Sequence, residues 1–203
     1  MTCSDGVVLG TDTRVTAGYL YIAHRKGKKV HKIDNHIGVT IAGTVAEAQN
    51  VIDTLRYYAN LYKIESQKPI PVKSIARISA NIFFAQRYYP LIADFLIGGY
   101  DQGEGNVLYS VDFFGALTKE DMVSTGSGSP VAYGILEDEY KKGMSSKEVV
   151  PIAIRAVSAA IKRNAGTGDG FDVAVITKEG GYRELTTLEK NKELLTITGS
   201  SRS

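Results

Sequence analysis

Two oppositely charged residues flank short apolar runs near the start of the chain. Asp12 follows Val7-Val8-Leu9, and Lys29 comes directly before Val30 to Ile33. A carboxylate can hold a lysine by a charge-assisted hydrogen bond, and a lysine beside a hydroxyl lowers the barrier to removing the hydroxyl proton. Taken alone, the two residues are more typical of a solvated charge at a strand end and a surface lysine.

Hydroxyl groups also occur in glycine-rich segments farther along the chain. Ser127 lies in Thr125-Gly126-Ser127-Gly128-Ser129, and Thr167 precedes Gly168-Asp169-Gly170. The segment from Gly126 to Pro130 lacks the lysine and the spacing of a phosphate-binding loop. A flexible Gly-Ser turn is an alternative interpretation of Ser127.

Strands are predicted where short apolar runs are separated by turn-forming residues. In the first part of the chain these runs are Val7 to Leu9, Tyr19 to Ala23, Val30 to Ile33 and Ile37 to Ile41. Farther along we expect strands at Phe95 to Tyr100, Val107 to Asp112, Ala116 to Thr118, Phe171 to Thr177 and Tyr182 to Thr186.

Helices are predicted where apolar residues recur at three- and four-residue steps. The first carries a stripe from Ala48 to Tyr62, and the second follows Pro71 with a buried face of Ile75, Ile78, Ile82 and Tyr89. A third runs from about Pro130 to Lys142, before Gly143, and a fourth opens with Ser145 and Glu148 at capping-box spacing.

Two features of the later part of the chain limit the helix predictions. Pro151 removes one helical hydrogen bond, so we expect a kink or a later start of the fourth helix. The polar tail, about residues 189–203, is expected to be frayed.

The order of strands, two helices, strands, two helices and strands has no βαβ alternation, which favours an α+β fold of antiparallel sheets covered by helix pairs.

Six short segments, in this order and at this spacing, resemble the signature of archaeal proteasome β subunits. They are Gly6 to Arg14, Lys28 to Ile33, Thr40 to Gly43, Gly98 to Asp101, Thr125 to Ser129 and Gly168 to Asp172. The resemblance covers about Thr2 to Leu188. It implies an N-terminal-nucleophile hydrolase, with a single domain over residues 1–203. The implied fold is a four-layer αββα sandwich, in which helix pairs flank two antiparallel five-stranded sheets.

The resemblance also implies a role for each residue that matches a catalytic position of the family. Lys29 matches the lysine beside the nucleophile, and Asp12 matches the carboxylate that holds it. Gly43 would offer its backbone N–H to the oxyanion of the tetrahedral intermediate. Ser127 would relay a proton close to the amino group of the nucleophile.

Other positions match the family's substrate-binding residues. Thr16 would pair with the extended backbone of the substrate. Asp112 would face the cleft of the adjacent subunit. The pocket for the residue before the cut would be lined by Val15, His31, Ile41 and Val45, and its apolar character predicts a preference for apolar side chains.

The chain departs from the family pattern at two catalytic positions. Where proteasome β subunits usually have an aspartate, two residues and a serine, this sequence has Asn164-Ala165-Gly166-Thr167. Thr167 keeps a hydroxyl, whereas Asn164 loses the negative charge that would stabilise a protonated amino terminus. The catalytic residues implied by the resemblance thus include Asn164 and Thr167, and the exchange at Asn164 predicts weakened catalysis.

The second departure concerns the nucleophile. In the family an amino-terminal threonine stands sixteen positions before the residue that matches Asp12, whereas Thr2 stands only ten positions before it. At about 3.3 Å per strand residue, the shortfall is roughly 20 Å. We therefore expect Thr2 to be an ordinary strand residue, and the chain as written to be inactive because it lacks the threonine.

Composition excludes several other classes of protein. With 24 basic and 22 acidic residues, the formal net charge of +2 gives no field for nucleic acid or an anionic membrane. No apolar run approaches the roughly 20 residues of a membrane span. The lone Cys3 fits a reducing cytoplasm. His24, His31 and His36 form no spaced ligand set with it, so we expect no metal and no cofactor.

The expected partners follow from the resemblance. They are proteasome α subunits and other β subunits in stacked seven-membered rings that form a 28-mer, with unfolded polypeptide as the substrate. Regulatory ATPases would make contact only through the α rings. A naturally non-catalytic structural β subunit is the main alternative, and a bacterial HslV-like protease is a third possibility.

Overall fold

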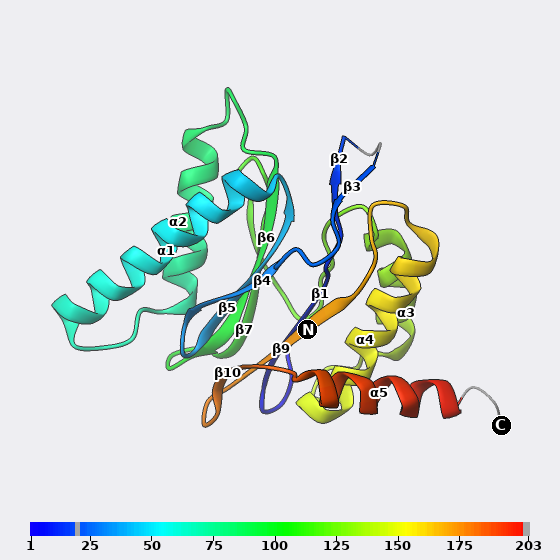
Figure 1. Ribbon diagram of the computed structural model, residues 1–203. Coiled ribbons are helices and arrows are strands. Elements are labelled where there is room, and N and C mark those ends of the chain that lie inside the picture. Colours follow the sequence, from blue (N-terminus) through cyan, green and yellow to red (C-terminus); the bar gives the residue numbers. More distant parts are fainter. Residues whose placement is uncertain (19–20, 201–203) are drawn as a thin grey trace.

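The computed structural model describes residues 1–18 and 21–200 of the chain (Figure 1). The first half contains β1 (Gly6–Asp12), β2 (Val15–Ala17), β3 (Tyr21–His24), β4 (Val30–Asp34), β5 (Ile37–Gly43), α1 (Val45–Ser66) and α2 (Val72–Ala85). The second half contains β6 (Ala93–Asp101), β7 (Gly105–Val111), β8 (Leu117–Glu120), α3 (Ser129–Glu139), α4 (Ser146–Arg163), β9 (Phe171–Thr177), β10 (Gly181–Glu184) and α5 (Thr187–Ser200).

One antiparallel sheet contains five strands in the order β4-β5-β6-β7-β8. Helices α1 and α2 cover its outer face (Figure 1). Their contact is a core of fully buried aliphatic side chains, with Phe83 of α2 packed edge-on against Phe95 of β6 at a ring distance of 5.1 Å. Burial of this apolar surface is the main force that holds the helix layer on the sheet.

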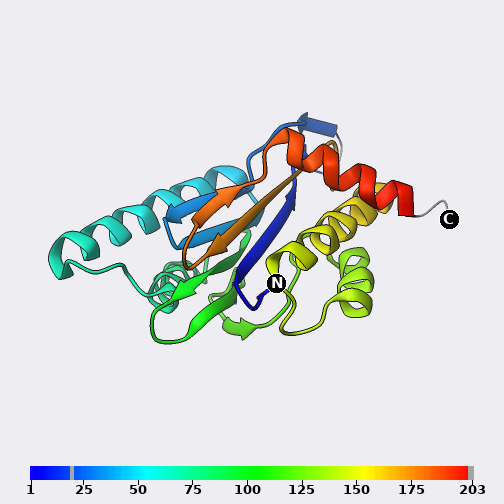
Figure 2. The ribbon, with the colours of Figure 1, turned by 90° about the horizontal axis from the view of Figure 1, so that it is seen from below.

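A second antiparallel sheet has the order β1-β9-β10, and α4 packs against its outer face beside α3. Between the two sheets lies a separate core formed by Val7, Leu9, Leu96, Leu108 and Ile176 among others. Figure 2 shows α1 and the pair α3 and α4 on opposite sides of the strands. The expected α+β sandwich of helix, sheet, sheet and helix layers is confirmed.

The second sheet differs in detail from the expectation of five strands. Within the described residues it has three strands, and β2 and β3 pair only with each other. A bridge between Thr2 and Val7 occupies the first part of β1's outer edge. The expected strand at Tyr19 to Ala23 is confirmed over its described part, while Tyr19 and Leu20 lie outside the described residues.

The four predicted helices are all present, but not every residue expected on a buried face is buried. In α2 the buried residues are Val72, Ile75, Ala76, Ser79, Ala80 and Phe83. Tyr89 lies beyond the end of this helix and is 87% exposed, so its assignment to the buried face is wrong. Helix α4 begins directly after the capping box of Ser145 and runs through Pro151, so the alternative of a later start is also wrong.

The tail expected to be frayed forms helix α5 instead. Thr186 and Glu189 cap its start: the Glu189 carboxylate accepts hydrogen bonds from the backbone and the hydroxyl of Thr186, and the backbone N–H of Glu189 donates to that hydroxyl. This capping box satisfies helix donors that have no intrahelical partner. Residues 201–203 lie outside the described residues.

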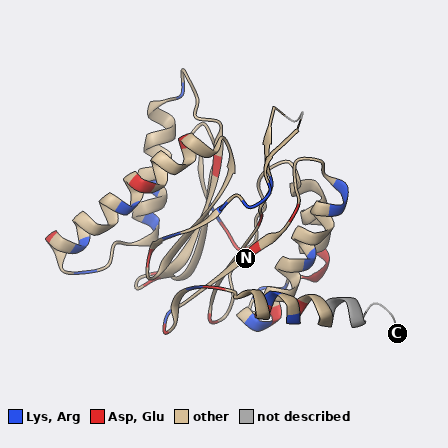
Figure 3. Ribbon diagram, viewed as in Figure 1, with Lys and Arg blue, Asp and Glu red and all other residues tan. Residues whose placement is uncertain are grey.

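Charged residues of both signs are interspersed along the helices of the two helix layers (Figure 3). No helix in the described part of the chain is long and apolar enough to cross a membrane. Over the same residues, no group of three or more His, Cys, Asp or Glu side chains has an arrangement that could hold a metal ion.

Candidate active site

Asp12 and Lys29 form an ion pair where β1 ends and β4 is about to begin. Lys29 Nζ donates to Asp12 Oδ1 over 2.7 Å, and the two side chains are only 17% (Lys29) and 13% (Asp12) exposed. Because water is largely excluded, the hydrogen bond is stronger than it would be at the surface. The pair predicted from the resemblance is thus formed in the structure.

The second carboxylate oxygen of Asp12 is also occupied. Asp12 Oδ2 accepts the backbone N–H groups of Arg14 and Gly168, each at 3.0 Å. A Cβ at Gly168 would come within 2.2 Å of the Arg14 guanidinium, so a larger residue there would displace that side chain. The aspartate is therefore fixed by three donors from three parts of the chain.

A second, neutral cluster contains Ser127, Asn164 and Thr167. Asn164 Oδ1 accepts hydrogen bonds from the Ser127 hydroxyl at 2.8 Å and the Thr167 hydroxyl at 3.0 Å, and from the backbone of Gly166 at 3.0 Å. Asn164 Nδ2 donates to the Ser127 carbonyl oxygen at 2.9 Å. The asparagine at the end of α4 thus holds both hydroxyl groups by uncharged hydrogen bonds.

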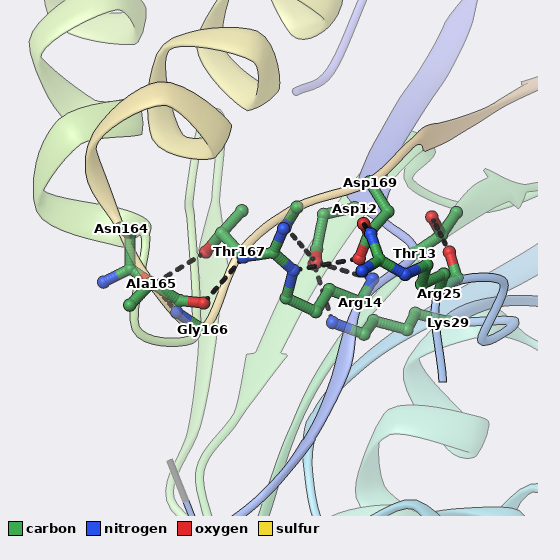
Figure 4. Close-up of polar contacts among 11 residues, drawn as sticks. Asp12, Thr13, Arg14, Arg25, Lys29, Asn164, Ala165, Gly166, Thr167 and Asp169 are labelled. Atoms are coloured by element: carbon green, nitrogen blue, oxygen red, sulfur yellow. Dashed lines mark hydrogen bonds and ion pairs between the residues drawn. The ribbon is translucent and has the colours of Figure 1, made fainter. Parts of the chain in front are cut away.

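Both clusters border one cavity of about 930 Å³. Figure 4 shows Asn164 and Thr167 of the neutral cluster, and Asp12 and Lys29 of the charged one, with Arg14 between them. The cavity is also lined by residues expected to bind substrate, namely Val15, Thr16, Ile41 and Val45. Its size and its mixture of apolar walls with a few polar groups are typical of a ligand site.

Gly43 lies on the cavity wall at the end of β5. Its φ of +113° belongs to a region that residues with a side chain rarely adopt. A Cβ at this position would come within 2.1 Å of the Ile92 carbonyl oxygen. The glycine therefore lets the backbone itself form the wall, as an oxyanion donor would require.

Two predicted substrate-binding residues, His31 and Asp112, do not line this cavity, and for Asp112 the prediction concerns the cleft of an adjacent subunit. His31 is not part of the cavity wall; its Nε2 lies 3.1 Å from the Lys28 carbonyl oxygen, and burial lowers the pKa of its ring. Asp112 accepts the backbone N–H groups of Phe114 and Ala116, at 2.9 and 2.8 Å, in the turn after β7. Within one chain both residues stabilise the backbone around them.

Sequence reasoning missed two groups near the cavity. The Asp169 carboxylate receives hydrogen bonds from Arg14 Nε at 2.9 Å and Arg25 Nη1 at 2.7 Å (Figure 4). Its place in the motif Gly168-Asp169-Gly170 is the only available signal. Asp94 lines the cavity, and burial raises the pKa of its carboxyl group; no pattern in the sequence indicates this.

The fold and the paired clusters define the class of protein. An α+β sandwich of two sheets between helix layers, with an Asp–Lys pair beside a glycine-walled cavity, has the architecture of an N-terminal-nucleophile hydrolase. A family model described as "Proteasome subunit" matches residues 1–176. The chain belongs to the proteasome subunit family and is of the β type.

Curated relatives agree with this assignment. "Proteasome subunit beta 2" of Nitrosopumilus maritimus (strain SCM1) is 51% identical over 92% of this chain and 87% of its own length. "Proteasome subunit beta 2" of Cenarchaeum symbiosum (strain A) is 50% identical over 96% of this chain and 90% of its own length. "Proteasome subunit beta 1" of Caldivirga maquilingensis (strain ATCC 700844 / DSM 13496 / JCM 10307 / IC-167) is 50% identical over 89% of this chain and 88% of its own length. The family is one of proteases, and its subunits assemble with one another into the proteasome core.

Proposed function

We propose that this β-type subunit is a threonine endopeptidase whose nucleophile reaches the cavity on a strand segment upstream of Met1. It degrades unfolded polypeptides in the cytoplasm, within seven-membered β rings stacked on α-subunit rings, and regulatory ATPases act only through the α rings. Without that segment, residues 1–203 hydrolyse no peptide. The observation that carries this proposal is the outer edge of β1 from Leu9 to Asp12, which lies beside the cavity and is covered by no strand of the described residues.

Thr2 does not fit the role of nucleophile. Its hydroxyl lies 3.3 Å from the Asp121 carbonyl oxygen, to which it donates, and 3.0 Å from the Tyr140 hydroxyl. Its neighbour Met1 pairs with Val8, four residues before Asp12 along β1, which is about 13 Å at strand spacing. The Thr2 hydroxyl is therefore tied to the wrong end of β1.

The same pairing indicates where an upstream segment would lie. Met1 and Val8 exchange two backbone hydrogen bonds of 3.0 Å, so an antiparallel ladder has already begun on this edge. If this ladder continues upstream in the same register, the fifth residue before Met1 stands opposite Thr13, which follows Asp12. A threonine at that position would have its amino group and hydroxyl beside the Asp12–Lys29 pair.

Thr11 supports the docking of such a segment. Thr11 lines the cavity, and its Oγ1 is buried with no hydrogen-bond partner among the described residues. Buried polar groups are normally satisfied, because an unpaired one costs about 1–3 kcal/mol. A strand paired with the outer edge of β1 would lie directly beside Thr11 and would bring polar backbone and side-chain groups within its reach.

The chemistry then follows from the geometry. Lys29, oriented by Asp12, lowers the barrier to deprotonating the threonine hydroxyl, which attacks the peptide carbonyl. The Gly43 N–H stabilises the oxyanion that forms, and the Ser127 hydroxyl relays a proton near the terminal amine. The apolar side chains Ile41 and Val45 favour an apolar residue before the cut.

Asn164 favours the second candidate, a non-catalytic structural β subunit. The hydrogen bonds of its amide are all neutral, and the amide provides no negative charge to stabilise a protonated terminal amine. Assembly would still proceed, because ring contacts through helix faces do not depend on one terminal residue.

The test compares two kinds of ring, both assembled with α subunits. One contains the 203-residue chain, and the other contains a chain extended so that an amino-terminal threonine stands five positions before Met1. We expect turnover of a fluorogenic peptide with an apolar residue before the cut only in the extended rings. Extended rings that assemble, as judged by native mass spectrometry, but stay inactive would establish the structural role. Monomers alone would contradict the assembly.

A further inference from the structure

Asp169 has an uncommon backbone conformation in the loop between α4 and β9. Its φ is +66°, and among the described non-glycine residues only Gln67 also has a positive φ. Gln67 caps the end of α1, where this conformation is frequent, whereas Asp169 caps no helix. Aspartate tolerates the left-handed region better than most residues, but surrounding contacts must offset the strain.

Those contacts are two ion pairs with separate segments. Arg14, just past β1, donates from Nε to Asp169 Oδ2, and Arg25, just past β3, donates from Nη1 to Oδ1. The Asp169 side chain is only 12% exposed. The hydrogen bond from Arg14 holds the pKa of Asp169 below its ordinary value, so the carboxylate is charged at neutral pH. We call Asp169, Arg14 and Arg25 the Asp169 bridge (Figure 4).

One arm of the Asp169 bridge leads to the catalytic pair. The backbone N–H of Arg14 and that of Gly168, the neighbour of Asp169, both donate to Asp12 Oδ2. Arg14 also donates from Nη1 to the Ala165 carbonyl oxygen at 2.9 Å, which fixes its guanidinium across the loop. The orientation of Asp12, which leaves Oδ1 to Lys29, therefore depends on residues that the bridge holds in place.

The other arm leads to the β2–β3 hairpin. The carbonyl oxygen of Arg25 accepts the Thr13 hydroxyl at 2.8 Å, and the Thr13 carbonyl oxygen accepts the backbone N–H of Gly27 at 2.8 Å. These bonds close the base of the hairpin, whose first strand brings Val15 and Thr16 to the cavity wall. The side chain of Arg25 anchors this base to the α4–β9 loop.

We propose that Asp169 is a positioning residue that sets two parts of the site at once. Through Arg14 it orients Asp12 toward Lys29, and through Arg25 it holds the hairpin against which an extended substrate pairs. This inference rests on the proposed function. It implies separable effects: the Arg14 arm governs the chemical step, and the Arg25 arm governs substrate binding.

Kinetics on rings of the threonine-extended subunit test this separation. Asp169→Asn keeps the size and the tolerance for positive φ but removes the charge, and we expect kcat to fall about tenfold and KM to rise about threefold. Arg25→Gln should raise KM alone, and Asp169→Glu should recover part of kcat. Asp53→Asn, which breaks an exposed ion pair on α1, is the matched control. Kinetic constants of Asp169→Asn equal to those of Asp53→Asn would overturn the inference.

Hydrogen–deuterium exchange of the 203-residue chain gives a readout that needs no activity. Asp169→Asn should speed exchange in residues 13–17 and 164–168, whereas Asp53→Asn should leave both segments unchanged. Unchanged exchange in Asp169→Asn would overturn the positioning role even if the rings are inactive. Faster exchange together with inactive parent rings would support the bridge and contradict only the proposed peptidase.

Discussion

The two ends of β1 are built in different ways. At its start, Met1, Thr2 and Cys3 are buried and fold back on the strand, and Thr2 is tied to Asp121 and Tyr140 by uncharged hydrogen bonds. At its far end, Asp12 stands at a cavity and is joined to Lys29 by an ion pair. Neutral, fully satisfied bonds suit a structural end, whereas an oriented charge pair beside open space suits chemistry.

The largest effect should come from the charge pair at the far end. In rings of the extended subunit, Lys29→Ala removes the group that we propose assists deprotonation of the nucleophile, so kcat/KM should fall at least about 1,000-fold. The measurement is turnover of the fluorogenic peptide, with native mass spectrometry to show that the rings remain intact. Retention of more than about a tenth of the activity would remove Lys29 from the mechanism.

The neutral cluster across the cavity should give the next largest effect. Asn164→Ala leaves the Ser127 and Thr167 hydroxyls and the Gly166 N–H without their common acceptor, so both side chains lose their positions. We expect kcat to fall about 100-fold in extended rings. The matched control is Asn50→Ala, which removes the same side chain at an exposed position on α1. Equal rates in the two variants would exclude a role for this cluster.

The near end of β1 should affect stability and leave activity alone. Thr2→Val keeps the shape but removes the hydroxyl shared with Tyr140, so the free energy of unfolding should fall by about 1 kcal/mol. Urea denaturation of the chain measures this loss, and peptide turnover by extended rings should stay within about twofold. A large loss of turnover in well-assembled rings would contradict the division between the two ends.

The smallest effect should be a change in the free energy of unfolding at acidic pH. The folded-state pKa of Asp169 is depressed by its hydrogen bond from Arg14, so the carboxylate contributes stability above its unfolded pKa of about 3.9. This contribution is lost as the pH falls through the folded pKa. The difference in unfolding free energy between the parent and Asp169→Asn should therefore be constant above about pH 5 and shrink below about pH 4. The difference for Thr2→Val should not change, because the partners of that hydroxyl, a carbonyl oxygen and a phenol, do not titrate in this range.

Some of this arrangement is predictable from sequence, for identifiable reasons. The predicted stripe of α1 is correct from Ala48 to Ala59 because large apolar residues lie between them. Tyr62, which was also expected on this stripe, is 37% exposed, so its assignment to the buried face is wrong. The face of α2 is harder to place because small residues, Ala76, Ser79 and Ala80, lie on its buried side. Helix α5 escapes prediction because its polar composition outweighs the capping box that Thr186 and Glu189 provide.

The site shows the same division. The candidate residues Asp12, Lys29 and Ser127 stand out in the sequence because short motifs carry them in a recognisable order. Asn164 is found only by its position shortly before the motif Gly168-Asp169-Gly170. The contact between Arg25 and Asp169 joins positions 144 residues apart, and neither residue has a neighbour in sequence that indicates the pairing. The outer edge of β1 and the buried Thr11 hydroxyl become visible only once the strands are in place.

We expect the nucleophile to lie at the far end of β1 and not at Thr2. A peptide vinyl sulfone alkylates a nucleophilic oxygen irreversibly, and tandem mass spectrometry locates the modified residue. With rings of the extended subunit, we expect one adduct on the amino-terminal threonine, which is lost in Lys29→Ala. On rings of the 203-residue chain we expect no adduct. An adduct on Thr2 in either ring would contradict this position of the nucleophile.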